Sequence, residues 1–466
     1  MSQAADPHAA LRRSVYLLLI VVSTGVILGR ILAVDTVDRL NKESQRRPFL
    51  SANDRSRWCT LRALVEPSMR VPGAPYAIDK VIEDRTWDTI DKVKHDGHYY
   101  SSKPMLLPTL QAAVYWPVYH LAGWSLGRQT YATVRLLLVL LNVLPLVVYF
   151  VLWSRLAERL GKSDWGRLFV MAAACFATFL TTFAVTLNNH VPGAVCAAIA
   201  LYAAIRIWLD RERRWRYFFL AGLFGALTVA DELPALSLLA ALSAVLLWKS
   251  PARALLALAP ACLLVAAGFF GTNWIAFHSL RPAYMHRSKT DPADNWYAYK
   301  DEKGHPGYWQ NPVGIDQGEP SRAIYAFHCL VGHHGIFSLT PVWIFSVVGL
   351  GIWLTRPEDR RLRELALLIA AVSLVCLAFY LFYLPQSDRN YGGMNSGLRW
   401  MFWFTPMWLL AMLPALDAMS ARRGLRGMAW LMLGVSVLSA SYPTWNPWTH
   451  PWLLNYLHYM GWLRGF

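Results

Sequence analysis

The chain has 466 residues, of which 55% are hydrophobic and only 16% are charged. A soluble globular protein carries about 25% charged residues, so this composition indicates a protein that exposes much of its surface to lipid. The formal net charge of +16 does not indicate a nucleic-acid partner. Its excess lies in short clusters between apolar runs, and no recognisable nucleic-acid-binding motif accompanies it.

The first apolar run covers residues 14–34 and follows Arg12 and Arg13. A secretory signal peptide begins in the same way, but this run is long enough to span a bilayer and no small-residue cleavage site follows it. We therefore expect a first helix that is retained in the membrane, with a cytoplasmic N-terminus.

Ten further apolar runs follow, each close to the roughly 20 residues that a helix needs to cross a bilayer. They cover residues 132–153, 168–186, 191–209, 217–230, 233–248, 254–277, 337–355, 365–384, 401–416 and 428–441. The short runs 217–230 and 233–248 fit either two spanning helices or one re-entrant hairpin. The sequence thus predicts an all-α integral membrane protein with about 11 transmembrane helices.

Short clusters of Lys and Arg lie between these runs, as the positive-inside rule describes for cytoplasmic loops. The clusters are Arg155/Arg159/Lys162/Arg167, Arg211/Arg213/Arg214/Arg216, Lys249/Arg253, Arg356/Arg360/Arg361/Arg363 and Arg422/Arg423/Arg426. They share one side with Arg12 and Arg13 only if the apolar stretch 105–124 does not span. Its two prolines, Gln and His suit a spanning helix poorly. We therefore expect residues 105–124 to lie along the outer face as an interfacial helix.

In this topology the outer side carries two long loops, residues 35–131 and 278–336, and the tail 442–466. Cys59 and Cys329 fall in the two loops, where an oxidising compartment would permit a disulfide between them. The tail carries four tryptophans that indicate an aromatic anchor at the membrane surface, namely Trp445, Trp448, Trp452 and Trp462.

The first outer loop has the densest set of residues suited to chemistry. It reads Ser-Ala-Asn-Asp-Arg-Ser-Arg-Trp at 51–58 and Asp-Gly-His-Tyr-Tyr-Ser-Ser-Lys-Pro at 96–104. A carboxylate near the membrane surface can accept a proton from an attacking hydroxyl or hold a divalent cation. Lys and Arg can bind a lipid-linked phosphate. The alternative is an ordinary solvated loop whose acids have no special role.

Several motifs follow one another along the chain in a distinctive order. They are Asp54, then Arg62-Ala63-Leu64-Val65-Glu66, then Tyr99-Tyr100-Ser101-Ser102-Lys103-Pro104-Met105-Leu106, then Gly335-Ile336-Phe337 with Thr340-Pro341, and last Asn390-Tyr391-Gly392-Gly393 with Gly397-Leu398-Arg399-Trp400. In this order the chain resembles the type-C (GT-C) membrane glycosyltransferases, especially the protein O-mannosyltransferase and aminoarabinose transferase branch. The resemblance implies a GT-C-like fold whose long first outer loop contains a juxtamembrane helix.

The resemblance also implies roles for individual residues. Asp54 takes the role of catalytic base or metal-side carboxylate, and Lys103 that of a cation that binds the donor phosphate. The further substrate-binding candidates are Arg55, Tyr100, His190 and Arg399. As alternatives, His190 caps a helix and Arg399 extends toward lipid head groups.

The chain departs from the family pattern at two places. Asp54 is followed by Arg55 rather than Glu, and the second outer turn reads Asn188-Asn189-His190 where relatives often carry an Asp. These departures leave the metal unknown, with a divalent cation as one option for a cofactor.

Other polar residues allow a purely structural interpretation as well as a functional one. The Asp231-Glu232 pair occupies a tight outer turn and is either functional or a solvated helix start. His328, His333 and His334 form a group with no supporting carboxylate close in sequence, which weakens a metal-site interpretation. A mixed-charge stretch indicates a solvated face at Asp79, Glu83, Asp84, Asp88 and Asp91. Asp54 itself is expected to be an exposed loop carboxylate whose removal barely changes stability.

We therefore expect a glycosyltransferase of the bacterial inner membrane that moves a sugar from a polyprenyl-phosphate donor to an acceptor on the non-cytoplasmic side. The expected division is a transmembrane module at 1–277 with its catalytic loop at 35–131, a second outer loop at 278–336, C-terminal transmembrane helices at 337–441 and an aromatic tail at 442–466. A transporter or lipid flippase, which would place charges in mid-helix, is the main alternative. A non-catalytic protein that retains the fold is the other.

Overall fold

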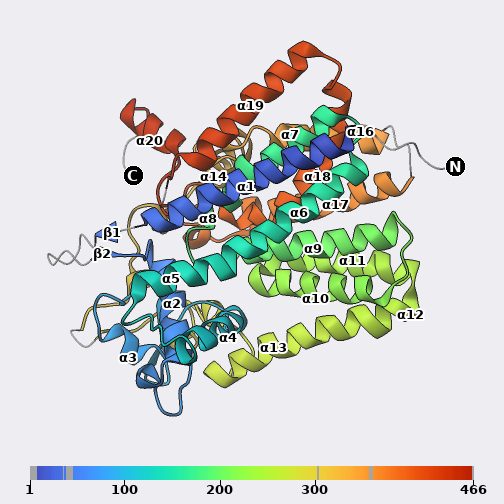
Figure 1. Ribbon diagram of the computed structural model, residues 1–466. Helices are drawn as coiled ribbons and strands as arrows, with labels where there is room; N and C mark the ends of the chain where they lie inside the picture. The colour runs from blue at the N-terminus through green and yellow to red at the C-terminus, as the bar shows by residue number, and fades with distance from the viewer. Residues whose placement is uncertain are drawn as a thin grey trace.

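The computed structural model shows a bundle of long helices with a loop-rich region at one end (Figure 1). It describes residues 8–34, 36–37, 46–301, 304–355, 360–444 and 446–463. Trp445, one of the four tail tryptophans, lies outside these described residues.

The long helices follow the apolar runs of the sequence to within a few residues. They are α1 (Ala9–Ala33), α5 (Thr130–Leu138), α6 (Leu144–Leu160), α7 (Asp164–Phe176), α9 (His190–Trp208), α10 (Trp215–Asp231), α11 (Leu236–Lys249), α13 (Ala259–Phe277), α16 (Trp343–Thr355), α17 (Arg360–Ala378), α18 (Thr405–Met419) and α19 (Arg423–Ser441). The shorter helices are α2 (Ala52–Val65), α3 (Asp79–Ile82), α4 (Leu106–His120), α8 (Phe179–Phe183), α12 (Pro251–Arg253), α14 (Arg322–Leu330), α15 (Ile336–Leu339) and α20 (Trp452–Tyr459). Two antiparallel hairpins pair β1 (Thr36–Val37) with β2 (Arg46–Arg47) and β3 (Lys92–His95) with β4 (His98–Ser101).

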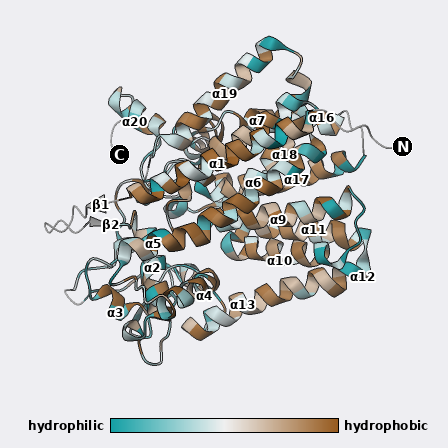
Figure 2. Ribbon diagram, viewed as in Figure 1, coloured by the Kyte–Doolittle hydropathy of each residue, from teal (hydrophilic) through white to brown (hydrophobic). Residues whose placement is uncertain are grey.

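Eight helical segments among the described residues are long and apolar enough to cross a membrane. The apolar residues colour the bundle helices, while hydrophilic ones gather at the helix ends and in the loops (Figure 2). The α1 helix shows the cause, because its buried residues Tyr16, Ile20, Ile27 and Ile31 recur at helical spacing while Leu17 remains 63% exposed. The chain is thus a helical, multi-pass membrane protein. The predicted number of eleven spans stays a prediction.

One end of the bundle collects the basic loops, as the sequence predicted, and we call it the basic end. Arg12, at the start of α1, lies 2.8 Å from Glu158 at the end of α6 and 2.6 Å from Asp164 at the start of α7. Three further contacts join the remaining basic loops there: Trp208 Nε1 donates to Glu364, Lys249 Nζ lies 3.6 Å from Glu364, and Ser163 donates to Asp417.

The α10 and α11 helices run over the length of α9 between the two ends of the bundle. Their connecting turn meets the start of α9, where Asn189 Nδ2 donates to Glu232 at 2.8 Å. Their other ends lie near Trp208 and Lys249 at the basic end. Both helices therefore extend from one end of the bundle to the other, and the choice between two spanning helices and a re-entrant hairpin stays a prediction.

At the end opposite the basic end, α2, α3 and α4 pack together beside the ends of α5 and α13 (Figure 1). The α4 helix covers most of the stretch 105–124 and is not among the helices that could span a membrane. Its Tyr115 donates to the buried Glu66 of the chain after α2 at 2.8 Å. A helix is therefore present as predicted, and its placement along a membrane surface stays a prediction.

The second outer loop packs on the β3–β4 hairpin of the first. Lys94 N donates to Trp296 O at 2.9 Å. The Trp296 ring lies between His95 and His286, at centroid distances of 3.9 and 3.6 Å. This contact fixes the two loops against each other above the bundle end.

One expectation about the tail is wrong, and the disulfide that the sequence permits between the outer loops is not formed. Cys59 and Cys329 are both free and buried. Trp448 is not a surface anchor: it is buried against Phe183 at 5.4 Å between ring centroids, and its Nε1 donates to Thr186. The tail therefore helps to close the outer end of the bundle.

Candidate active site

The α2 helix starts with a capping box that engages Asp54. The backbone N–H of Asp54 donates to Ser51 Oγ at 3.2 Å, and Asp54 Oδ1 accepts from Ser51 N at 2.8 Å. Its Oδ2 accepts from Leu50 N and from Thr186 Oγ1, both at 3.0 Å. Asp54 is only 1% exposed, so the expectation of an exposed loop carboxylate is wrong. Burial raises the pKa of Asp54 despite these hydrogen bonds.

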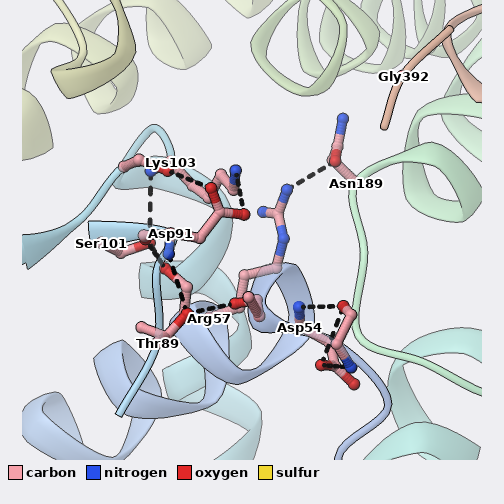
Figure 3. Close-up of polar contacts among 12 residues, drawn as sticks. Asp54, Arg57, Thr89, Asp91, Ser101, Lys103, Asn189 and Gly392 are labelled. Atoms are coloured by element: carbon pink, nitrogen blue, oxygen red, sulfur yellow. Dashed lines mark hydrogen bonds and ion pairs between the residues drawn. The ribbon is translucent and has the colours of Figure 1, made fainter. Parts of the chain in front are cut away.

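A second acid of the first loop, Asp91, forms a buried ion pair with Lys103. Lys103 Nζ lies 2.9 Å from Asp91 Oδ2, and Figure 3 shows the two side chains pointing toward each other. Burial alone would raise the pKa of Asp91, but the charge and hydrogen bond of Lys103, with Arg399 and Arg57 beyond it, hold that pKa below its usual value. The expectation that Asp91 lies on a solvated face is therefore wrong.

The β3–β4 hairpin brings Asp91 and Lys103 together. Lys92 and Ser101 form the pair at the open end of the hairpin. The residues that precede Lys92 and follow Ser101 therefore lie side by side. The turn is formed by Asp96 and Gly97, which have φ values of +48° and +83°. An Asp-Gly pair of this kind is a strong hairpin signal in a sequence, and it is the signal that could have located Asp91.

Hydroxyl groups bind this hairpin to α2. Ser56 Oγ donates to Asp91 O at 2.7 Å and lies 2.6 Å from Ser101 Oγ. Thr89 Oγ1 donates to Ala52 O at 2.7 Å. All three hydroxyl-bearing residues are buried, so these hydrogen bonds set the distance between α2 and the Asp91–Lys103 pair.

Arg57 of α2 points toward the same place and was missed by the sequence interpretation, which chose Arg55. Arg57 is buried, and its Nη2 donates to Asn189 Oδ1 at 2.6 Å (Figure 3). Burial lowers the pKa of Arg57 to about 10, against the opposing charges of Asp231 and Asp91. Residues two apart on a helix project about 200° apart. Arg55 accordingly points elsewhere and donates to Asp88 O at 2.7 Å.

The second and third outer turns meet beside Arg57. Asn189 Nδ2 donates to Glu232 Oε1 at 2.8 Å, and His190 Nδ1 forms a short hydrogen bond with the same carboxylate. His190 Nε2 lies 3.2 Å from Arg399 Nη1. His190 is thus buried inside a polar network, where its two ring nitrogens contact Glu232 and Arg399 rather than cap the start of α9.

Arg399 lies in the short helical segment just before α18 and joins the same network. Its Nε donates to Gly392 O at 2.9 Å, and its guanidinium lies 4.9 Å from the Trp448 ring centroid. Gly392 has φ +89°, and a Cβ there would lie 3.1 Å from Arg399 Nε, so only glycine permits this close approach. Arg399 therefore points into the protein rather than toward lipid head groups.

Tyr100, another sequence candidate, does not join this network. Its ring is buried and packs edge-on against Phe277 at a centroid distance of 5.1 Å. Burial raises its pKa to about 12. Adjacent residues on a strand face opposite sides, so the neighbouring Ser101 contacts α2 while Tyr100 packs toward α13.

These contacts define one group of buried and half-buried ionisable residues at the outer end, which we call the charged cluster. It consists of Arg57, Asp91, Lys103, His190, Glu232 and Arg399. The charges of Arg399 and Arg57 also lower the pKa of Asp91. Of the predicted site residues, Lys103, His190 and Arg399 belong to the cluster, whereas Asp54 adjoins it through α2.

Among the described residues, no group of three or more His, Cys, Asp or Glu side chains is placed to hold a metal ion. The three histidines before α15 contact each other. The His328 and His333 rings stack at 3.8 Å between centroids, and the His333 and His334 rings lie 4.7 Å apart.

No protein-family model matches the chain, and neither does any curated protein. Solved structures of an oligosaccharyltransferase from Archaeoglobus fulgidus do match. Its complex with Zn and sulfate has a TM-score of 0.46 at 13% identity, covering 93% of this chain and 53% of that one. Its complex with an inhibitory peptide and a dolichol-phosphate has a TM-score of 0.41 at 13% identity, covering 92% and 55%. The chain thus spans about half the length of these oligosaccharyltransferase chains.

Proposed function

We propose that the chain is a membrane glycosyltransferase that transfers a sugar from a polyprenyl-phosphate donor to an acceptor hydroxyl. The observation that carries the proposal is the convergence of three cations from separate segments on the charged cluster. Arg57 comes from α2, Lys103 follows β4, and Arg399 precedes α18. Arg57 is buried and Lys103 and Arg399 are half-buried, and bringing three such cations together is costly unless anions offset their charge.

A phosphate group suits these cations better than a sugar or a peptide alone. Guanidinium groups bind phosphate oxygens in pairs of hydrogen bonds, and an ammonium adds a point charge. Arg57 and Arg399 contact the neutral acceptors Asn189 and His190 rather than carboxylates at hydrogen-bond distance. Among the described residues, none accepts a hydrogen bond from the buried Nε of Arg57. Donor capacity is therefore available for an incoming anion.

Asp91 is the carboxylate that we assign to proton transfer, in place of Asp54. Both oxygens of Asp54 are occupied by the helix start and by Thr186. Asp91 has a lowered pKa, so it is ionised at neutral pH and can accept a proton. In the proposed reaction the acceptor oxygen bonds to the anomeric carbon as the bond to the lipid phosphate breaks. The acceptor proton passes to Asp91, and the cations stabilise the departing phosphate.

The proposed setting follows the membrane topology. The donor's lipid tail would lie between the helices and its phosphate at the outer end, while the basic end would face the cytoplasm of a bacterial inner membrane. The transmembrane module at 1–277 would carry the catalytic loop 35–131. The loop at 278–336, the helices at 337–441 and the tail at 442–466 would complete the outer wall of the site.

The proposal is tested by donor turnover. Purified protein is incubated with a panel of radiolabelled polyprenyl-phosphate sugars and a membrane extract that supplies acceptors. We expect release of polyprenyl phosphate with one donor, and a loss of rate of about 10²–10⁴-fold in Asp91→Asn. The matched control is Asp84→Asn, an exposed acid of the same loop. Transport of an intact donor across vesicles without release of polyprenyl phosphate would favour a flippase and contradict the proposal.

A further inference from the structure

A separate cavity lies at the basic end, far along the bundle from the charged cluster. It has a volume of about 560 Å³ and lies between α1, α6 and α9. Its charged lining consists of Arg13, Arg155, Glu158, Arg159, Arg206 and Asp210. Four cations thus face two anions in one open cavity, and nothing in the proposed transfer reaction uses them.

The two acids of the cavity are already paired with other arginines. Glu158 accepts hydrogen bonds from Arg12 at 2.8 Å. Asp210 accepts from Arg159 at 2.7 Å and from Arg206 at 2.6 Å. The lining therefore keeps a net positive charge after its internal ion pairs are formed.

Arg13 and Arg155 supply that excess. Both are exposed, and within the described part of the chain neither has an acidic partner. They belong to different helices, α1 and α6, and they meet at the same cavity. Two free guanidinium groups on facing helices form a binding geometry for a phosphodiester anion.

The surface beside each of these arginines is apolar. Leu17 follows Arg13 by one helical turn and is 63% exposed, and Val151 precedes Arg155 by one turn and is also exposed. Figure 2 shows hydrophobic residues along α1 and α6 in the body of the bundle. A cation pair at the membrane boundary above exposed apolar side chains matches a lipid, whose head group is anionic and whose chains are apolar.

We infer that this cavity binds the head group of an anionic phospholipid. Arg13 and Arg155 hold the phosphodiester, and the acyl chains lie along α1 and α6 against Leu17 and Val151. The site is independent of the glycosyl-transfer proposal, because it lies at the opposite end of the bundle and shares no residue with the charged cluster.

Native mass spectrometry of the full chain released from detergent tests the inference. Phosphatidylglycerol and phosphatidylcholine with the same acyl chains are offered together at equal concentration. We expect the wild-type protein to retain phosphatidylglycerol preferentially. The preference should fall about fivefold for Arg13→Gln or Arg155→Gln, and further for the double variant, because each basic residue near a membrane surface contributes about 1 kcal/mol. Arg423→Gln, an exposed arginine outside the cavity, is the matched control and should match wild type.

Three results would overturn the inference. Equal retention of the two lipids by the wild type, or an unchanged preference in the double variant, would remove the lipid site. Displacement of phosphatidylglycerol by excess inorganic phosphate, with phosphate bound equally well in the absence of lipid, would assign the cavity to a soluble anion instead. Each single variant must elute as a monodisperse species, so that the comparison concerns folded protein.

Discussion

Lys103 Nζ lies 2.9 Å from Asp91 Oδ2 in a pair that the β3–β4 hairpin brings together from the two sides of its turn. Removing one partner of a buried ion pair leaves an uncompensated charge, which costs about 3–5 kcal/mol. A donor phosphate can replace Asp91 as the partner of Lys103. Binding of the donor would then free the carboxylate at the moment when the acceptor needs a base.

This relationship makes the acidic side of the pH profile sensitive to Lys103. The pKa of Asp91 lies below its usual value of about 4, so kcat/KM in the wild type should stay flat down to about pH 4 and fall only below it. In Lys103→Met, burial still raises the pKa and its main opposing charge is gone. The acidic limb should therefore move to higher pH. An acidic limb at the same pH in both proteins would show that Asp91 is not the titrating base.

The cations of the charged cluster should each strengthen donor binding. Replacing Lys103 or Arg399 by Ala should weaken binding of the donor by about 1.5–3 kcal/mol, the usual contribution of a hydrogen bond to a charged group. Binding is measured by calorimetry in detergent. Lys80→Ala, an exposed lysine of the same loop, should bind the donor as wild type does. Unchanged affinity in both cluster variants would exclude a phosphate clamp.

Asp54 should matter for stability. In Asp54→Asn the amide nitrogen would face Leu50 N or Ser51 N, which are donors themselves. The loss of accepted hydrogen bonds in a buried site should lower the free energy of unfolding by about 1–3 kcal/mol. Thermal unfolding in detergent measures this, with Asp84→Asn as the control. A variant that unfolds as the wild type does but has no activity would return the catalytic role to Asp54.

The membrane topology predicts that the two ends of the bundle face opposite sides. Arg128 and Arg422 are exposed residues near the outer and basic ends. Cysteines placed there should react with an impermeant thiol reagent from opposite sides of sealed vesicles. The buried position of Ser125, which donates to Glu66, makes it unsuitable for labelling. Labelling of both cysteines from the same side would contradict the predicted number of spans between them, a number that does not depend on residues 105–124.

The sequence was sufficient for the helices because apolar length and basic loops are local features. It also singled out Lys103, whose motif is contiguous and which pairs with Asp91 in the charged cluster; its role in donor binding stays a prediction. It failed for Asp54 and Asp91, because their environments depend on contacts between distant segments. Thr186 reaches Asp54 from 132 positions away, and the pairing of Asp91 depends on the hairpin register. The Ser51–Asp54 capping box can be recognised in the sequence, and it marks Asp54 as part of a helix start.

Arg57 and Glu232 illustrate the remaining difficulty. Choosing between Arg55 and Arg57 required knowing which face of α2 points into the site. A short polar helix has too little hydrophobic periodicity for the sequence to reveal that face. The role of Glu232 required knowledge that the turn after α10 meets the start of α9. Tertiary packing alone brings these side chains together.

The central claim is that the charged cluster binds a lipid-linked phosphate, and a structure with polyprenyl phosphate tests it most directly. Cryo-electron microscopy of the protein in lipid nanodiscs with this ligand should place the phosphate within about 3 Å of at least two of Arg57, Lys103 and Arg399. The lipid tail should then leave the site between helices. Density for the phosphate at the basic end beside Arg13 and Arg155, with the Asp91–Lys103 pair undisturbed, would contradict the claim.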